Sequence, residues 1–184
     1  MENSAKILVT GGAGFIGSNI IINQILNTDN KILNLDKLTY AGSQDSLVSI
    51  ENHTNYQFIK GDILNKKQVL MAIKKIDIVY HFASIADIDV ANNFPYNTLN
   101  INILGTINIL ESCVKNKVKR IIFASSIYAL SEQGGFYSAS KLTSEIIIEQ
   151  YSKKFELDYN ILRFGSLYGD RSNYFNSLGK YIIQ

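Results

Sequence analysis

Short apolar runs alternate with longer amphipathic segments along the chain. The short runs predict buried strands at residues 6–10, 31–36, 56–60, 76–82, 120–124 and 158–163. The longer segments predict helices at about 15–27, 66–74, 96–116 and 136–154, with another from about 173. Strands that alternate with helical crossovers predict an α/β fold in which helices cover both faces of a doubly wound parallel sheet, the Rossmann arrangement.

Composition and charge exclude several other classes of protein. The chain has 184 residues, of which 46% are hydrophobic and 18% charged, as in a single globular domain. Its net charge of +2 is too small to indicate nucleic-acid binding. No signal peptide or membrane-length apolar run is found, so we expect no membrane partner and a cytoplasmic setting. With one cysteine and two histidines we expect neither an internal disulfide nor a metal site.

A glycine-rich turn between the first strand and the first helix carries the strongest chemical signal. Gly11 permits a sharp turn, Gly14 lets the backbone approach a pyrophosphate, and Gly17 lets the helix pack close to the strand. The pyrophosphate would lie on free N–H groups at the helix N-terminus, where Phe15 and Ile16 begin the helix. This spacing of glycines predicts a dinucleotide site.

An acidic residue, Asp36, ends the second predicted strand at the distance from the glycine turn that a dinucleotide site requires. Its carboxylate would accept hydrogen bonds from the adenosine ribose hydroxyls and would repel a 2′-phosphate. The alternative is a turn with a purely structural role, which the strand before it and the helix after it disfavour. The cofactor that these residues predict is therefore NAD rather than NADP.

A second group of polar residues is suited to proton transfer. Tyr137 and Lys141 lie one helical turn apart, so the phenol and the ammonium share a face. A nearby positive charge lowers the pKa of a tyrosine, which can then take a proton from a substrate hydroxyl while hydride moves to nicotinamide. Ser125 and Ser126 follow the fifth strand at the edge where ligands bind. We expect Tyr137 to be the base, Lys141 to lower the pKa of Tyr137, and either serine to position the substrate hydroxyl. The alternative is that the Tyr-x-x-x-Lys spacing is a chance match on a surface helix.

The chain resembles the extended short-chain dehydrogenase/reductase family, the NAD-dependent sugar-nucleotide epimerases and dehydratases. Besides the glycine turn, Asp36 and the Tyr137–Lys141 pair, the resemblance rests on Gly61-Asp62-Ile63, His81-Phe82-Ala83, Asn102-Ile103-Leu104-Gly105-Thr106, Leu162-Arg163 and Leu167-Tyr168-Gly169. It implies an enzyme that binds NAD and acts on a nucleotide-sugar.

The resemblance also assigns expected roles to single residues. It implies that Asp62 and Ile63 contact adenine and that Ala83 lines the cofactor cleft. It further implies that Asn102 braces the long helix at the site and that Lys141 also binds the nicotinamide ribose. The two long helices, at about 96–116 and 136–154, would form the four-helix interface of a homodimer; on their own they could equally pack only against the sheet.

The residues after the fifth strand bear on the type of reaction. The segment from 34 to 43 resembles that of dTDP-glucose 4,6-dehydratases, which place a Thr-Asp-Glu triplet after this strand as acid and base. The matching place here holds Ser125-Ser126-Ile127 without a carboxylate. We therefore expect a nucleotide-sugar epimerase, with a dehydratase or a non-catalytic NAD-binding protein as the alternatives.

The family also carries a C-terminal lobe that binds the nucleotide-sugar, and we expect it to be largely missing from this chain. Residues 1–184 would then form an NAD-binding Rossmann domain, as a fragment or as a naturally short relative. We expect this domain to bind NAD but to be a poor or inactive catalyst, because contacts to the remote part of a substrate supply much of the binding that accelerates a reaction.

Overall fold

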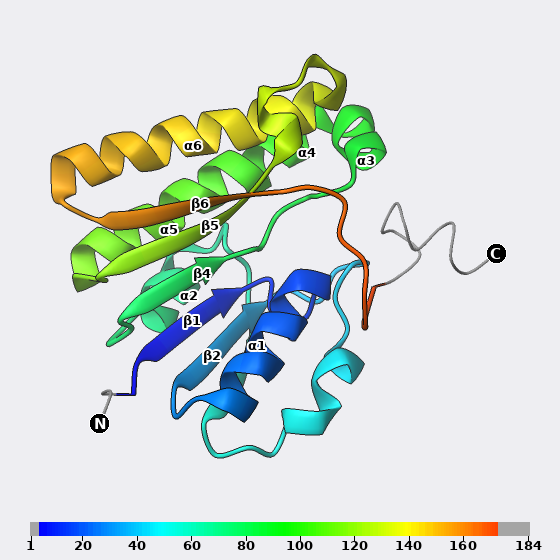
Figure 1. Cartoon of the computed structure of the whole chain (residues 1–184). Coiled ribbons are helices and arrows are strands. Elements are labelled where there is room, and N and C mark those ends of the chain that lie inside the picture. Colours follow the sequence, from blue (N-terminus) through cyan, green and yellow to red (C-terminus); the bar gives the residue numbers. More distant parts are fainter. Residues whose placement is uncertain (1–3, 173–184) are drawn as a thin grey trace.

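Six parallel strands form the sheet at the centre of the molecule (Figure 1). The computed structural model describes residues 4–172, and the helix expected from about 173 lies outside them. The strands are β1 (Lys6–Thr10), β2 (Lys31–Asp36), β3 (Tyr56–Lys60), β4 (Ile78–His81), β5 (Arg120–Ser126) and β6 (Asp158–Phe164). Their spatial order is β3-β2-β1-β4-β5-β6, and all neighbours pair in parallel. The expected doubly wound fold is confirmed, and the order of strands reverses between β1 and β4.

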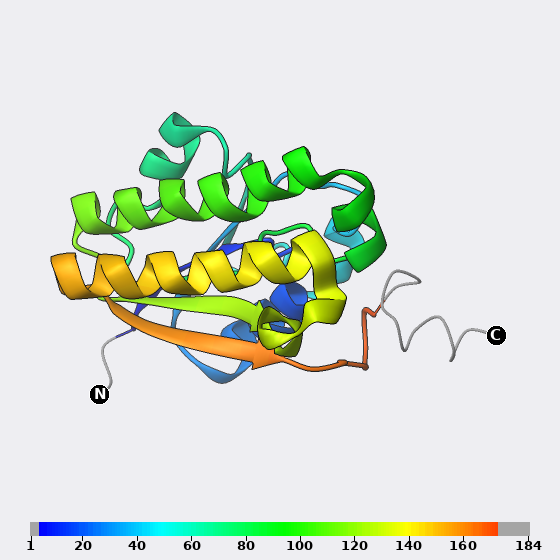
Figure 2. The same cartoon turned by 90° about the horizontal axis from the view of Figure 1, so that it is seen from above.

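Helices cover both faces of this sheet (Figure 2). They are α1 (Phe15–Asn27), α2 (Lys66–Ala72), α3 (Ile88–Asn93), α4 (Pro95–Leu99), α5 (Gly105–Asn116) and α6 (Gly135–Phe155). On one face α2, α5 and α6 pack together; on the other lies α1 with a 3-10 helix, Gln44–Ile50. Within residues 4–172, none of these helices combines the length and hydrophobicity needed to span a membrane.

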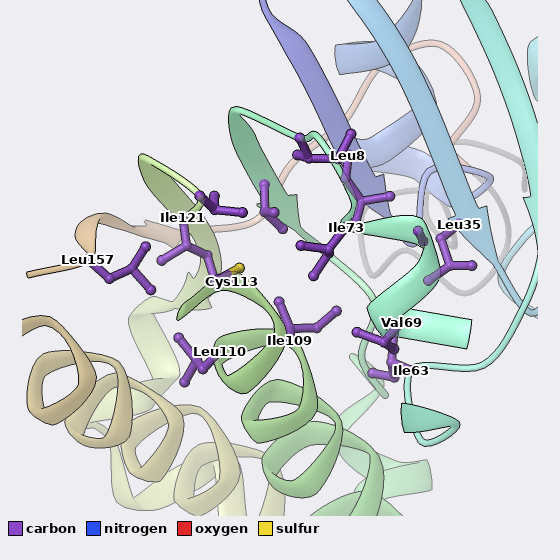
Figure 3. Close-up of a cluster of buried hydrophobic side chains, with 14 of the residues drawn as sticks. Leu8, Leu35, Ile63, Val69, Ile73, Ile109, Leu110, Cys113, Ile121 and Leu157 are labelled. Atoms are coloured by element: carbon purple, nitrogen blue, oxygen red, sulfur yellow. The ribbon is translucent and has the colours of Figure 1, made fainter. Parts of the chain in front are cut away.

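The alternation of side chains along β1 divides the core into two layers. Leu8 points toward α2 and α5 and packs in the cluster drawn in Figure 3, which also holds Ile109 and Cys113. Ile7 and Val9 point the other way, toward α1. Burial raises the pKa of the Cys113 thiol to about 12, so this cysteine is a protonated core residue. The central strands β1 and β5 are largely apolar because both of their faces are covered, whereas the edge strand β6 is mostly exposed.

The structure corrects three of the expected element boundaries. β4 is shorter than expected, and β5 runs on through Ser126, so both serines lie within the strand rather than after it. The long helix expected at 96–116 is divided into α4, a π-helical turn (Asn100–Leu104) and α5. In this turn the carbonyl oxygen of Asn102 accepts hydrogen bonds from the hydroxyls of Thr106 and Ser144. These side-chain bonds compensate for the irregular backbone pattern of the turn.

Candidate active site at the carboxyl edge of the sheet

Gly11 and Gly14 of the β1–α1 turn and Gly17 of α1 are required for two different reasons. Gly11 has φ of +72°, and a Cβ there would lie 2.6 Å from the backbone nitrogen of Ala83. A Cβ on Gly17 would lie 2.4 Å from the carbonyl oxygen of Gly11. At Gly14, by contrast, the nearest atom is the carbonyl oxygen of Gly11 at 3.3 Å, a tight contact that a shift of a few tenths of an ångström would relieve. Gly11 and Gly17 therefore serve the fold, whereas Gly14 keeps open the approach to the turn.

The start of α1 has the properties of an anion-binding site. Gly14 is its N-cap, and no side chain caps the helix there. The first N–H groups of a helix have no partner within the helix and carry the positive end of its dipole. The open cradle at Gly14 and the N–H groups of Phe15 and Ile16 thus fit the pyrophosphate of a dinucleotide.

Asp36 lies beside this turn with its carboxylate already partly bound. Its two oxygens accept hydrogen bonds from the backbone N–H of Ala13 at 2.9 Å and of Leu38 at 2.8 Å. A carboxylate oxygen has two lone pairs, so each can still accept one bond from a ribose hydroxyl. The structure therefore holds the carboxylate rigidly at the end of β2, next to the glycine turn.

The residues expected to contact adenine have partners in the protein. Asp62 forms an ion pair of 2.7 Å with Lys37. Partial burial acts to raise the pKa of Asp62, but the bonds from Lys37 and from the backbone N–H of Leu64 outweigh it and lower the pKa. The side chain of Ile63 packs in the core, which leaves only its main chain for a contact with adenine.

Ala83 and His81 lie where β4 ends against the glycine turn. The backbone N–H of Ala83 donates to the hydroxyl of Thr10 at 3.3 Å. The two ring nitrogens of His81 face the hydroxyls of Thr10 at 2.7 Å and Thr106 at 3.0 Å. Burial, together with the charge of Lys141, lowers the pKa of His81 to about 3. This histidine is thus a neutral, fully bonded packing residue at physiological pH.

Asn102 ties the π-helical turn to the loop after β4. Its amide oxygen accepts from the backbone N–H of Ile85 at 2.8 Å, and its amide nitrogen donates to the carbonyl of Ile85 at 3.0 Å. The same nitrogen donates to the Ser140 hydroxyl on α6 at 2.9 Å. Because Asn102 is buried and all three bonds are internal, it fixes α6 relative to the loop and does not face solvent.

Tyr137, Lys141 and Ser126 come together at the start of α6. The Ser126 hydroxyl is hydrogen-bonded to the phenol of Tyr137. The ammonium of Lys141 lies 5.7 Å from the centre of the Tyr137 ring and donates to the carbonyl of Ala124 at 2.8 Å and the hydroxyl of Ser84 at 3.1 Å. All three residues are buried. They form a compact polar group at the carboxyl edge of the sheet, on the side of β4 that faces β5.

The pKa of Tyr137 differs from the sequence-based expectation. Burial raises it, and the hydrogen bond from Ser126 offsets this only in part. Desolvation also lowers the pKa of Lys141 to about 7, against the opposing effect of Glu145. The expected lowering of the tyrosine pKa by Lys141 was therefore wrong for the protein alone, because burial penalises both charged forms.

Two polar contacts of the site were missed by sequence reasoning. The hydroxyl of Ser125 donates to Glu145 on α6, so this serine does not face Tyr137. Arg171, after β6, donates to the side chain of Asn19 on α1 and borders a pocket of about 120 Å³ beside Phe15. Neither contact has a local sequence signal, since each joins segments that only the fold brings together.

A model of the NAD dependent epimerase/dehydratase family matches residues 7–183. The chain is 30% identical to the low-salt glycan biosynthesis protein Agl12 of Haloferax volcanii. That match covers 96% of this chain and 61% of the Haloferax protein. It is 32% identical to a mouse dTDP-D-glucose 4,6-dehydratase, with 89% of the chain and 51% of that protein covered. The chain thus spans between about half and three fifths of the length of these relatives.

Solved structures of related enzymes share the fold. A UDP-N-acetylglucosamine 4-epimerase from Methanobrevibacter ruminantium superimposes with a TM-score of 0.86 at 28% identity, covering 94% of this chain and 58% of that one. The dTDP-glucose 4,6-dehydratase DesIV from Streptomyces venezuelae, solved with NAD bound, gives a TM-score of 0.89 at 26% identity, covering 97% and 61%. Both types of reaction therefore occur among proteins with this arrangement of strands and helices.

Proposed function

The chain belongs to the NAD-dependent epimerase/dehydratase family, and we propose that it uses NAD for hydride transfer at a sugar carbon of a nucleotide-sugar. The observation that carries this proposal is the buried Tyr137–Lys141–Ser126 group, on the sheet edge where the glycine turn and Asp36 also lie. A proton-transfer group beside a dinucleotide cradle is the arrangement that oxidation of an alcohol requires.

Each residue of the group has a distinct part in this proposal. Tyr137 takes the proton of the sugar hydroxyl, and Ser126 holds the same oxygen. Lys141 binds the nicotinamide ribose and places a positive charge near the phenol. Bound oxidised NAD supplies the hydride acceptor and a positive ring that favours the phenolate form of a nearby tyrosine. We assign the positioning role to Ser126 rather than Ser125 because Ser126 is the serine that is hydrogen-bonded to Tyr137.

Within this function we propose epimerisation rather than dehydration. Water elimination needs an acid and a base besides the tyrosine. The triplet Ser125-Ser126-Ile127 holds no carboxylate, and the first carboxylate after it, Glu132, is exposed. Glu145, the buried carboxylate nearest to Ser125, is held by Arg163 and is not available to eliminate water.

We expect the chain to bind NAD at least ~10-fold more tightly than NADP, a difference of about 1.4 kcal/mol. The Asp36 carboxylate would repel a 2′-phosphate, and the charge of neighbouring Lys37 is already paired with Asp62. Calorimetric titration with both cofactors measures the ratio, and Lys37→Gln is the control expected to leave it nearly unchanged. Equal or tighter binding of NADP would refute the assignment of Asp36.

We propose that a homodimer forms through α5 and α6. Apolar side chains are exposed on this face, with Leu142 at 37% and Ile146 at 51% of their accessible area. Ile146→Glu is expected to convert the dimer to monomer in sedimentation velocity. Met71→Glu, which adds the same charge at a 70% exposed position on α2, should leave the dimer intact. A monomeric wild type at high concentration would exclude this interface.

A further inference from the structure

Glu145 is a buried carboxylate to which the proposed reaction gives no role. It lies one helical turn after Lys141 on α6 and is 3% exposed. One oxygen accepts from the Ser125 hydroxyl and from Nε of Arg163 at 3.0 Å; the other accepts from Nη2 of Arg163 at 2.6 Å. A two-point bond from the planar guanidinium fixes both the position and the orientation of this carboxylate.

Three successive turns of α6 contact the last residues of β5. Tyr137 is hydrogen-bonded to Ser126, the Lys141 ammonium donates to the Ala124 carbonyl, and Glu145 accepts from Ser125. The Glu145–Arg163 pair extends this line of contacts to β6, because Arg163 pairs with Ser125 in the sheet. The carboxylate therefore connects the strand that carries Ser126 to the helix that carries Tyr137.

The charges around Lys141 show how Glu145 affects the pKa of this lysine. Desolvation lowers the pKa of Lys141 to about 7, and Glu145 is the group that raises it. Of the other titratable neighbours, His81 on β4 is neutral and Tyr137 on α6 has a raised pKa. Burial acts to raise the pKa of Glu145, but bonds from Arg163 and Ser125, with the charges of Arg163 and Lys141, lower it below its ordinary value. Glu145 is therefore ionised at neutral pH.

We propose that Glu145 is a positioning residue of the reaction: held by Arg163 one helical turn after Lys141, its carboxylate is the counter-charge of the buried Lys141 side chain and fixes the end of β5 beside Tyr137. This inference rests on the proposed function, because it acts through the role assigned to Lys141. A merely structural ion pair would affect the stability of the sheet and leave the protonation of Lys141 unchanged.

The test is a titration of Lys141 by NMR with ¹³C-labelled lysine, assigned with Lys141→Met. In Glu145→Gln the pKa of Lys141 should fall by about one unit, a tenfold shift in its protonation equilibrium. Glutamine keeps the shape and still accepts from Ser125 or Arg163, whose side chain is 43% exposed and can be solvated. Glu149→Gln, which removes the same charge one turn further along α6, should leave the titration unchanged.

An unchanged pKa of Lys141 in Glu145→Gln, or an equal shift in Glu149→Gln, would overturn the proposal. If Glu145→Gln does not fold, Glu145→Leu removes the same charge with an apolar side chain of similar size, and it should lower the pKa of Lys141 in the same direction. In active protein, the alkaline limb of the pH–rate profile should move to lower pH in Glu145→Gln. The NMR titration needs no turnover, so failure of the proposed function is detected separately, as absence of hydride transfer in the wild type.

Discussion

Tyr137→Phe is expected to lower the rate of hydride transfer by ~10²–10⁴-fold, the usual cost of losing a general base. The substitution removes one hydroxyl and keeps the ring, which packs against Ile85 and Ala91. The fold and the affinity for NAD should therefore stay close to those of the wild type. Single-turnover absorbance of reduced nicotinamide measures the rate, and calorimetry measures the affinity.

A matched control distinguishes the role of the Tyr137 hydroxyl from the general effect of removing a tyrosine hydroxyl from α6. Tyr151→Phe removes the same group from the same helix, where the hydroxyl donates to Glu111 on α5. Its rate of hydride transfer should remain near that of the wild type. Undiminished transfer in Tyr137→Phe would assign the proton transfer to another residue.

Gly14→Val is expected to reduce NAD affinity by more than ~100-fold, about 2.7 kcal/mol, while the chain still folds. The backbone at Gly14 has φ of −80° and ψ of 176°, which a valine adopts without strain. A Cβ there would meet only the carbonyl oxygens of Gly11 at 3.3 Å and Ala41 at 3.9 Å. The side chain would instead fill the space through which a pyrophosphate approaches α1.

A graded series makes this prediction sharper. Gly14→Ala should weaken NAD binding less than Gly14→Val, because it fills less of the same space. Gly17→Ala should instead destabilise the fold, since its Cβ would lie 2.4 Å from the backbone of the turn. Thermal unfolding distinguishes the two effects. Normal NAD affinity in a folded Gly14→Val would show that the cofactor does not lie on this turn.

The sheet and most of its helices could be predicted because their signals are local. An apolar run such as Ile121–Ala124 identifies a buried strand without knowledge of its neighbours. The division of the long helix was not predictable in this way. The π-helical turn depends on hydrogen bonds from Asn102 to Ile85 and Ser140, which lie far away in the sequence.

In the candidate site, too, the residues with local sequence signals could be predicted and those that depend on long-range contacts could not. The glycine turn, Asp36 and the Tyr137–Lys141 pair have fixed spacings, so the sequence alone indicates them. The choice between Ser125 and Ser126 depends on what α6 presents to each serine, and only the fold shows this. The role of Glu145 could not be predicted, because its partner Arg163 lies on β6 and a lone glutamate on a helix carries no signal. The pKa of Tyr137 could not be predicted either, because burial decides its direction.

The central claim is that this site transfers hydride between a nucleotide-sugar and NAD. Its most direct test is single-turnover mixing of the NAD-loaded chain, in excess, with a panel of UDP- and dTDP-linked hexoses. We predict that reduced nicotinamide forms with at least one sugar in the wild type, and ~10²–10⁴-fold more slowly in Tyr137→Phe. Equal rates in both proteins, or no reduced nicotinamide in a wild type shown to bind both NAD and the sugar, would contradict the claim.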